Sequence, residues 1–133
     1  MARRSSRRPR RAPVHDCPCG SGRTYGACCG RLHAGTAGAE TAEALMRSRY
    51  SAFALGDTAY LLRTWHPDTR PARLDLAGER RWTGLEIVET SGGTAFHSSG
   101  TVAFRAHYRD PEGPGVQEET SEFLRIEGAW HYR

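Results

Sequence analysis

The chain has 133 residues, 38% hydrophobic and 26% charged, which fits one soluble domain with at most a small accessory module. No stretch reaches the roughly 18 apolar residues that a membrane-spanning helix needs, so the sequence excludes a membrane protein. All 19 basic residues are arginines, and six of them lie in residues 1–14, where no acidic residue occurs. The rest of the chain holds 13 arginines against 15 acidic residues, so the net charge of +4 does not indicate a basic binding face.

Residues 1–14 form a predicted disordered tail that is rich in arginine. Apart from Met1, no large apolar residue precedes Val14, so the segment cannot bury enough surface to offset the entropy of ordering it. No apolar segment follows the paired arginines as an export signal requires, which favours a cytoplasmic protein. Arginines can contact nucleic-acid phosphates, but no aromatic residue lies among them to stack on bases. We expect a solvated extension, with unspecific nucleic-acid binding through residues 1–14 as the alternative.

A cysteine cluster follows the tail and is the most specific chemical signal in the chain. The four cysteines form two close pairs in the segment CPCGSGRTYGACC, at positions Cys17, Cys19, Cys28 and Cys29. A cytoplasmic chain has little use for disulfides, and a bridge within either pair would be strained. Four thiolates instead complete the tetrahedron of a structural zinc site, so we expect one Zn²⁺ per chain on these cysteines and no open catalytic position.

The residues around the cysteines fit the same interpretation. The glycines between the pairs allow a sharp turn, and residues 24–29 are expected to form one helical turn that stops at Gly30. His15 and His33 flank the cluster and are alternative ligands; otherwise they are solvated loop histidines. We expect this zinc knuckle to be separate from the core, so that loss of one cysteine would loosen residues 16–33 and leave the core folded.

Two helices are predicted next. Thr41 caps the first helix, which runs through Leu55 and stops at Gly56. Asp57 caps a shorter second helix, which runs to about Thr64 and ends because a proline follows soon after.

Arg49 lies in the middle of the apolar face of the first predicted helix. An unpaired buried charge costs on the order of several kcal/mol, so we expect Arg49 to be buried or to line a cavity together with a carboxylate partner. The candidate partners lie on the strands expected to cover the helix, at Glu86, Glu119 and Glu122. We favour Glu86. The alternative is a guanidinium that reaches solvent along its apolar stem.

Strands are predicted in the second half of the chain, over residues 85–90, 101–109, 116–126 and 129–132, with a loop at 110–115 and a hairpin turn at Glu127-Gly128. Residues 101–109 alternate between apolar and polar, which places His107 on a solvated face of the sheet. The three tryptophans are expected in the core, at Trp65, Trp82 and Trp130. Helices followed by an antiparallel meander predict an α+β fold with the helices on one face of the sheet.

Two sets of residues resemble known families. The segment CPCGSGRTYGACCG resembles the SEC-C motif, a small zinc-binding module also found at the C-terminal tail of the SecA translocation ATPase. Residues 45–53 (LMRSRYSAF), 64–67 (TWHP) and 82–87 (WTGLEI) resemble the YchJ-like family of bacterial proteins. The resemblance implies a SEC-C-like zinc knuckle over residues 15–35 and a cone-shaped nuclear-transport-factor-2-like (NTF2-like) domain over residues 36–133. The family has no assigned reaction, so the resemblance implies an architecture and no activity.

Cones of this class enclose a pocket, and some similar folds are isomerases or dehydratases. The candidate pocket residues are Arg49, Tyr50, Trp65, His66, Asp68 and Glu86. His66 is a candidate general base oriented by Asp68, and the alternative is that Asp68 caps a turn at Thr69 while His66 hydrogen-bonds a backbone carbonyl. The chain has no glycine-rich phosphate loop, nucleophile elbow or catalytic metal set, so we assign no catalytic residue and do not favour an enzyme.

The favoured function is therefore a zinc-binding, non-catalytic adaptor protein. A closed thiolate site builds a recognition surface and performs no chemistry, and the resemblance to the SecA module implies a protein partner or the ribosome. The first alternative is a small-molecule enzyme or ligand binder that uses Arg49 and His66 in the cone. The second is a nucleic-acid binder that uses the arginine-rich tail.

Overall fold

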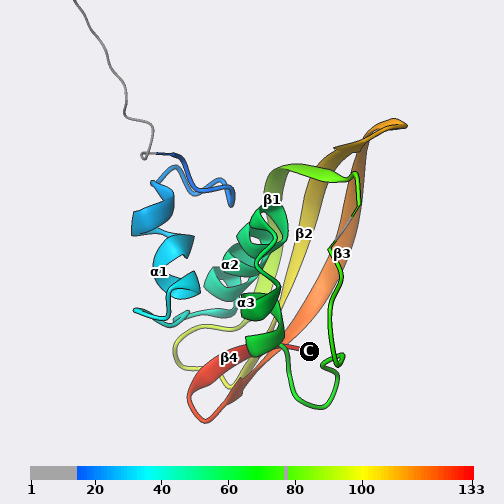
Figure 1. The fold of residues 1–133 in the computed structure, drawn as a ribbon. Coiled ribbons are helices and arrows are strands. Elements are labelled where there is room, and N and C mark those ends of the chain that lie inside the picture. Colours follow the sequence, from blue (N-terminus) through cyan, green and yellow to red (C-terminus); the bar gives the residue numbers. More distant parts are fainter. Residues whose placement is uncertain (1–14, 77) are drawn as a thin grey trace, which may run out of the picture.

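The computed structural model describes residues 15–76 and 78–133, and the predicted tail over residues 1–14 lies outside them. The helical elements come first, as η3 (Tyr25–Ala27), α1 (Cys29–His33), α2 (Ala42–Leu55) and α3 (Thr58–Arg63). The strands follow, as β1 (Arg81–Gly92), β2 (Ser99–Asp110), β3 (Gly113–Ile126) and β4 (Ala129–Tyr132). Figure 1 shows α2 and α3 between the curved sheet and the N-terminal cysteine segment. The expected α+β fold, with a cysteine knuckle before helices packed on an antiparallel sheet, is confirmed.

The two main helices begin and end where their capping residues predict. The Thr41 Oγ1 atom accepts the Ala44 N–H at 3.0 Å, which satisfies one of the free donors at the start of α2. Gly56 ends α2 with φ of 77°, a left-handed conformation that glycine adopts without steric cost. Asp57 then caps α3 by accepting the Tyr60 N–H at 3.1 Å. These caps bring α3 back against α2 after a very short connection.

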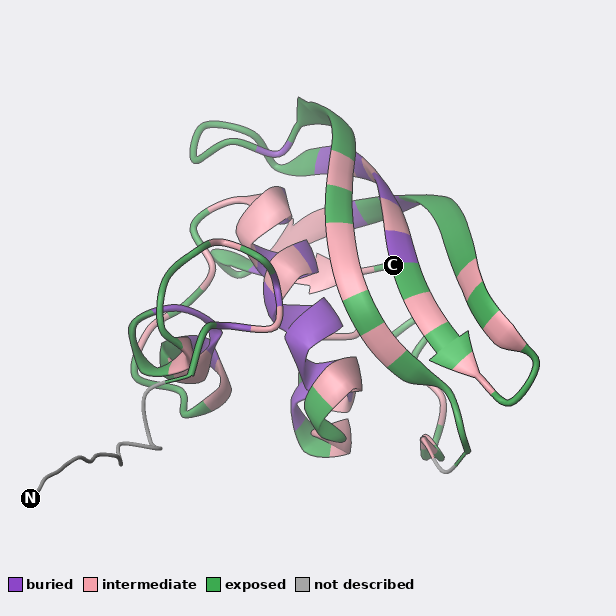
Figure 2. Ribbon diagram, turned by 90° about the horizontal axis from the view of Figure 1, so that it is seen from above, coloured by how far each residue is buried: buried purple, intermediate pink, exposed green. Residues whose placement is uncertain are grey.

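The sheet is a four-stranded antiparallel meander in the order β1-β2-β3-β4. The predicted loop at 110–115 is wrong, because the β2–β3 ladder continues to the pair Asp110↔Gly113. β1 also begins at Arg81 instead of the predicted residue 85. Both extensions lie toward the exposed ends of the sheet (Figure 2), where backbone pairing continues without the apolar alternation on which the prediction rested. The predicted turn at Glu127-Gly128 is confirmed, with φ of 51° and 87° at its two residues.

One face of the sheet packs against α2 and forms the core. Val102, Phe104 and Phe123 on the strands meet Leu45 and Met46 on α2 in one buried cluster. Complete burial of side chains of this size contributes about 1.5–3 kcal/mol each, so this interface holds the helix on the sheet. Figure 2 shows the buried segments gathered where the helices meet the sheet.

The opposite face of the sheet carries exposed charged residues. The Arg105 Nε atom lies 2.6 Å from Glu118 Oε2, and His107 Nε2 lies 3.3 Å from Glu86 Oε1. The expected solvated position of His107 is therefore confirmed.

The end of the cone is closed by contacts between the segment after α3 and β4. His66 N–H donates to the Tyr132 carbonyl at 2.6 Å, and Tyr132 N–H donates to the Thr64 carbonyl at 2.8 Å. Trp130 is 3% exposed, as expected for the core, and its indole N–H donates to the Glu40 carbonyl at 3.3 Å. Trp65 and Trp82 are only partly buried, because both line a cavity between the helices and the sheet.

Candidate metal centre and cone pocket

The four cysteines are brought together by a small backbone framework in the N-terminal segment. Asp16 and Thr24 form an isolated antiparallel bridge, and Cys17 N–H donates to the Arg23 carbonyl at 2.8 Å. The loop between them turns through two glycines with positive φ, and η3 then returns the chain to the first pair. The two pairs of cysteines thus face each other across a short loop.

The sulfur atoms have the spacing that a tetrahedral zinc ion requires. All four Sγ atoms lie within 4.8 Å of one another, and the Cys19–Cys28 and Cys28–Cys29 separations are 3.7 Å and 4.0 Å. A Zn–S distance of about 2.3 Å in a regular tetrahedron gives sulfur–sulfur separations of about 3.8 Å. All four residues are free cysteines and at most 6% exposed, so the donor set fits a closed metal site.

The pKa values of the clustered thiols differ from one another. Hydrogen bonding to the Cys29 thiol lowers the pKa of Cys19 to about 4, although burial acts in the opposite direction. The same hydrogen bond, together with burial, raises the pKa of Cys29, and burial also raises the pKa of Cys17. The Cys19 thiolate therefore forms readily, whereas the thiolates of Cys17 and Cys29 need a bound cation to compensate their charge.

Three arginines surround the cysteines. Arg23 Nη2 lies 4.0 Å from the Cys28 sulfur, and Arg31 Nε donates to the Cys28 carbonyl at 3.2 Å. Arg47 on α2 donates from Nη1 to the Cys19 carbonyl at 2.8 Å. Sequence reasoning missed Arg47, because its position near the site follows only from the way the knuckle packs on α2.

His33 has a role that the sequence did not predict. Its side chain is 5% exposed; Nδ1 lies 2.6 Å from the Tyr25 hydroxyl, and Nε2 lies 2.8 Å from the Ser48 carbonyl of α2. The ring is thus a buried link between α1 and α2, neither the expected solvated loop histidine nor a member of the four-cysteine group. His15, the other alternative ligand, is exposed and also lies outside that group.

The knuckle and the core are not separate, contrary to the sequence prediction. The four cysteines belong to the same buried cluster as side chains of α2 and of the sheet. Cys17 Sγ lies 3.5 Å from Ser51 Oγ in the middle of α2. The apolar thiol surfaces cover part of the helix, so the domain would lose buried contacts if the knuckle opened.

The predicted helix end at Gly30 is also wrong. Gly30 lies inside α1, and the chain turns only after His33, with Gly35 at φ of 81°. A Cβ atom at Gly30 would lie 2.7 Å from the Tyr25 carbonyl oxygen. Glycine is needed there for a close approach of α1 to η3, not for a left-handed helix end.

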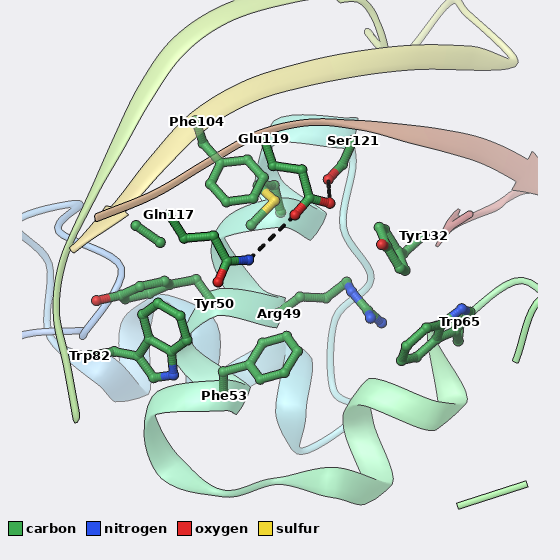
Figure 3. A pocket seen from close by; sticks show the side chains of 12 residues that line it. Arg49, Tyr50, Phe53, Trp65, Trp82, Phe104, Gln117, Glu119, Ser121 and Tyr132 are labelled. Carbon is green, nitrogen blue, oxygen red and sulfur yellow. Dashed lines mark hydrogen bonds between the residues drawn. The ribbon is translucent and has the colours of Figure 1, made fainter. Parts of the chain in front are cut away.

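The cone contains a cavity of about 220 Å³ between α2, the segment after α3 and the inner face of the sheet (Figure 3). Three predicted pocket residues line it, namely Arg49, Tyr50 and Trp65. Sequence reasoning named Glu119 on β3 only as a candidate partner of Arg49 and missed its polar neighbours in the cavity, Gln117 and Ser121. The spacing of two along the strand puts these three residues on one face, a signal that the sequence already contained.

Arg49 is buried as predicted, but its expected pairing with Glu86 is wrong. The residue is 3% exposed, and its Nη1 atom donates to the Leu61 carbonyl at 2.8 Å and to Thr64 Oγ1 at 2.6 Å. The guanidinium carbon lies 4.4 Å from the ring centre of Tyr132, a cation–π contact. Burial lowers the pKa of Arg49 to about 10, so the side chain is still charged at neutral pH.

Glu86 lies on the other face of the sheet. Its carboxylate is 3.6 Å from Arg105 Nη1 and 3.3 Å from His107 Nε2, and all three side chains are exposed. The register of β1 turns Glu86 away from α2, and alternation within a short predicted strand did not reveal which face would be covered.

His66 and Asp68 do not line the cavity. His66 Nδ1 accepts the backbone N–H of Asp68 at 3.0 Å, and the exposed Asp68 carboxylate lies 3.9 Å from the same nitrogen. Thr69 N–H donates to the His66 carbonyl at 3.0 Å. The pair therefore lies in the turn that follows α3, as the alternative interpretation expects, but the His66 ring accepts a backbone N–H there instead of bonding a carbonyl.

Together these features define a class of protein, a SEC-C motif joined to an NTF2-like domain. The SEC-C motif model matches residues 16–31, and the model of the YchJ middle NTF2-like domain matches residues 41–133. The chain belongs to the YchJ-like family, whose members carry the name UPF0225 protein.

Several relatives are similar along most of their length. A UPF0225 protein of Streptomyces coelicolor is 62% identical over 120 residues, covering 90% of this chain and 94% of the relative. One from Deinococcus radiodurans is 48% identical over 121 residues, covering 90% and 88%. The solution structure of a SEC-C motif-containing protein from Rhodopseudomonas palustris has a TM-score of 0.78 at 37% identity, covering 89% of this chain and 94% of that one. A crystal structure of such a protein from Psychrobacter arcticus has a TM-score of 0.76 at 29% identity, covering 90% and 81%.

The expected resemblance to the SEC-C motif and to the YchJ-like family is confirmed. The names of these relatives and structures state no reaction. Among residues 15–76 and 78–133, no helix combines the length and apolar character needed to cross a bilayer.

Proposed function

We propose that the chain binds one Zn²⁺ through Cys17, Cys19, Cys28 and Cys29 and uses it as a structural brace. The observation that carries the proposal is the clustering of the four sulfur atoms within 4.8 Å of one another, with two separations of 3.7 and 4.0 Å, which suits a zinc ion at the centre of the four thiolates. Four cysteine ligands leave no open position for water or substrate, so the metal is structural and the protein non-catalytic at this site. When bound, zinc supplies the positive charge that lets the buried thiols ionise together.

The brace would fix a polar groove between the knuckle and α2, which we propose as the docking surface of a protein partner in the cytoplasm. Arg23, Arg31 and Arg47 line this groove next to Cys28, together with Glu43, which pairs with Arg47 at 3.0 Å, so the arginines outnumber the acidic residue three to one. Guanidinium groups offer planar forks of donors that suit carboxylates, so the proposed partner is a protein segment rich in acidic residues. The ribosome and nucleic acid bound through residues 1–14 are the other outcomes of the test.

The metal proposal is tested by X-ray absorption and metal analysis on protein purified without chelators. We expect one zinc per chain with four sulfur neighbours at about 2.3 Å. Cys28→Ser should lose most of the metal, whereas Ser98→Ala, an exposed serine far from the cysteines in the sequence, should keep one zinc per chain. Metal-free wild-type protein, or a mixed nitrogen–sulfur shell, would contradict the proposal.

The partner proposal is tested separately by NMR titration of the zinc-loaded chain with a glutamate-rich peptide. We expect shifts around the groove, and weaker binding by Arg31→Gln than by Arg105→Gln, a matched control on the other face of the sheet. Co-sedimentation with purified ribosomes but no peptide binding would favour the ribosome instead. Loss of RNA binding on deletion of residues 1–14, with the peptide inactive, would favour the nucleic-acid alternative.

A further inference from the structure

Arg49 is a buried cation whose hydrogen-bonding capacity the protein does not fill. A guanidinium has five N–H donors, and the two recorded hydrogen bonds both leave from Nη1. Within the described parts of the chain, the donors on Nε and Nη2 reach no protein acceptor and no carboxylate lies within 4.0 Å. The residue is only 3% exposed, but these two nitrogens are not sealed off, because Trp65 Nε1 is the only wholly buried side-chain nitrogen or oxygen without a partner among the described residues; they keep access to the cavity that Arg49 lines. A buried charge in this state favours an anion that can reach it.

The cavity gives such an anion a route to Arg49. Arg49 lines it together with Trp65 and Tyr132, whose rings lie 5.1 Å and 4.4 Å from the guanidinium carbon. Figure 3 shows the guanidinium between these two rings, with Phe53 and Phe104 on the other walls. These rings confine the anionic group from the sides and leave the planar edge of the guanidinium as its recognition element. The edge matches a carboxylate, which is also planar.

The wall of the cavity that β3 forms carries a negative charge. The Glu119 carboxylate accepts hydrogen bonds from Ser121 Oγ at 3.2 Å and from Gln117 Nε2 at 3.4 Å, both neutral, and no cationic side chain of residues 15–76 and 78–133 forms an ion pair with it. Glu119 and Gln117 are exposed, so this side is the open one. A dianion such as phosphate would be repelled by Glu119, whereas a ligand with an ammonium group would gain from it.

The size of the cavity restricts the ligand further. About 220 Å³ lies below the range of about 300–1,000 Å³ that holds drug-sized ligands, so the occupant is of single-ring size. The walls are mainly aromatic, which suits an apolar or aromatic body.

From these observations we propose that the cone binds a small zwitterion, an α-amino acid with an apolar or aromatic side chain or a close analogue. Its carboxylate pairs with Arg49, its ammonium group faces Glu119, and its side chain packs among Phe53, Trp82 and Phe104. This site is separate from the cysteine cluster, so it neither needs nor tests the zinc proposal. No covalent step is involved.

The experiment is calorimetric titration of the zinc-loaded full chain with three probes that share one ring. L-phenylalanine carries both charges, phenylacetate only the carboxylate, and phenethylamine only the ammonium group. We expect one site for L-phenylalanine, with affinity about tenfold or more above that for either partial probe, because each charge-assisted hydrogen bond is worth about that factor.

Variants assign the two charges. Glu119→Gln changes an exposed side chain, so the variant should fold. It should bind L-phenylalanine about tenfold more weakly and should bind phenylacetate no more weakly than the wild type does, because a repulsion between two carboxylates is removed. Arg49→Lys keeps the positive charge but loses the planar pair of N–H donors. It should weaken the binding of both probes that carry a carboxylate, L-phenylalanine and phenylacetate. Gln117→Phe should weaken all probes by filling the open side, while Glu86→Gln on the other face of the sheet should change none.

The proposal is overturned if none of the three probes binds saturably and none shifts the indole NMR signals of Trp65 and Trp82. It is also overturned if phenethylamine binds as well as L-phenylalanine. Equal binding of L-phenylalanine by wild type and Glu119→Gln would remove the ammonium part of the assignment and with it the zwitterion. Because Glu119→Gln does not touch the core, this result stands even if the Arg49 variant fails to fold.

Discussion

His33 is the residue on which the coupling between the knuckle and the NTF2-like domain depends most directly, so His33→Ala is the sharpest test of this architecture. The imidazole joins the Tyr25 hydroxyl at 2.6 Å to the Ser48 carbonyl of α2 at 2.8 Å. Its ring also packs on Tyr60, with 4.5 Å between ring centres. The substitution removes all three contacts at once.

The loss of stability that we expect for His33→Ala follows from these contacts. Two hydrogen bonds contribute about 0.5–1.5 kcal/mol each, and the ring pair adds about 0.5–1.5 kcal/mol beyond its buried area. We therefore expect His33→Ala to lower the free energy of unfolding by about 2–4 kcal/mol, a large part of the total of about 5–15 kcal/mol for a domain. His33→Phe keeps the ring packing but not the bonds, and should cost less than the alanine variant.

Urea unfolding followed by two signals measures this effect, with far-ultraviolet circular dichroism reporting the domain and release of zinc to a chelating dye reporting the knuckle. The two transitions should coincide in the wild type, because the cysteines share the buried cluster of α2. In His33→Ala the zinc signal should be lost at lower urea than the domain signal. His107→Ala, an exposed histidine, should stay within about 0.5 kcal/mol of the wild type. An unchanged midpoint for His33→Ala would refute the linking role of His33.

Three further predictions follow from individual contacts. The effects of Arg49→Met and Glu86→Gln on the free energy of unfolding should add to within about 0.5 kcal/mol in a double-mutant cycle, because the two side chains lie on opposite sides of the sheet. A larger coupling energy would be evidence that the two side chains do form an ion pair. Gly30→Ala should destabilise by about 1–3 kcal/mol in thermal unfolding, since its Cβ would meet a carbonyl at 2.7 Å, whereas Gly26→Ala meets nothing within 4 Å and should be nearly neutral; equal melting temperatures for the two would contradict this. Burial raises the pKa of Tyr60, so the folded chain keeps this proton above about pH 10 where the unfolded chain releases it, and the free energy of unfolding should fall as the pH rises past that point. Tyr60→Phe should make that alkaline fall shallower, and an identical pH profile would argue against it.

The sequence alone determined the features that depend on neighbouring residues. The caps at Thr41 and Asp57 and the stop at Gly56 are local, because a side chain bonds a backbone group three residues away or a glycine adopts a positive φ. The two cysteine pairs also lie close in the chain, so their spacing could indicate a metal site before any fold was known. The turn at Glu127-Gly128 belongs to the same group.

Only the tertiary structure decided which groups distant in the chain meet. The helical wheel placed Arg49 on the buried side of α2, but the register of β1 turned Glu86 outward and left the carbonyl of Leu61 as the acceptor. The sequence predicted His33 to be a loop residue, because no residue near it in the chain indicates that it bonds the Ser48 carbonyl on α2. Local patterns state which face of an element is apolar, whereas the partner of a buried polar group depends on strand register and helix packing, which the whole chain sets together.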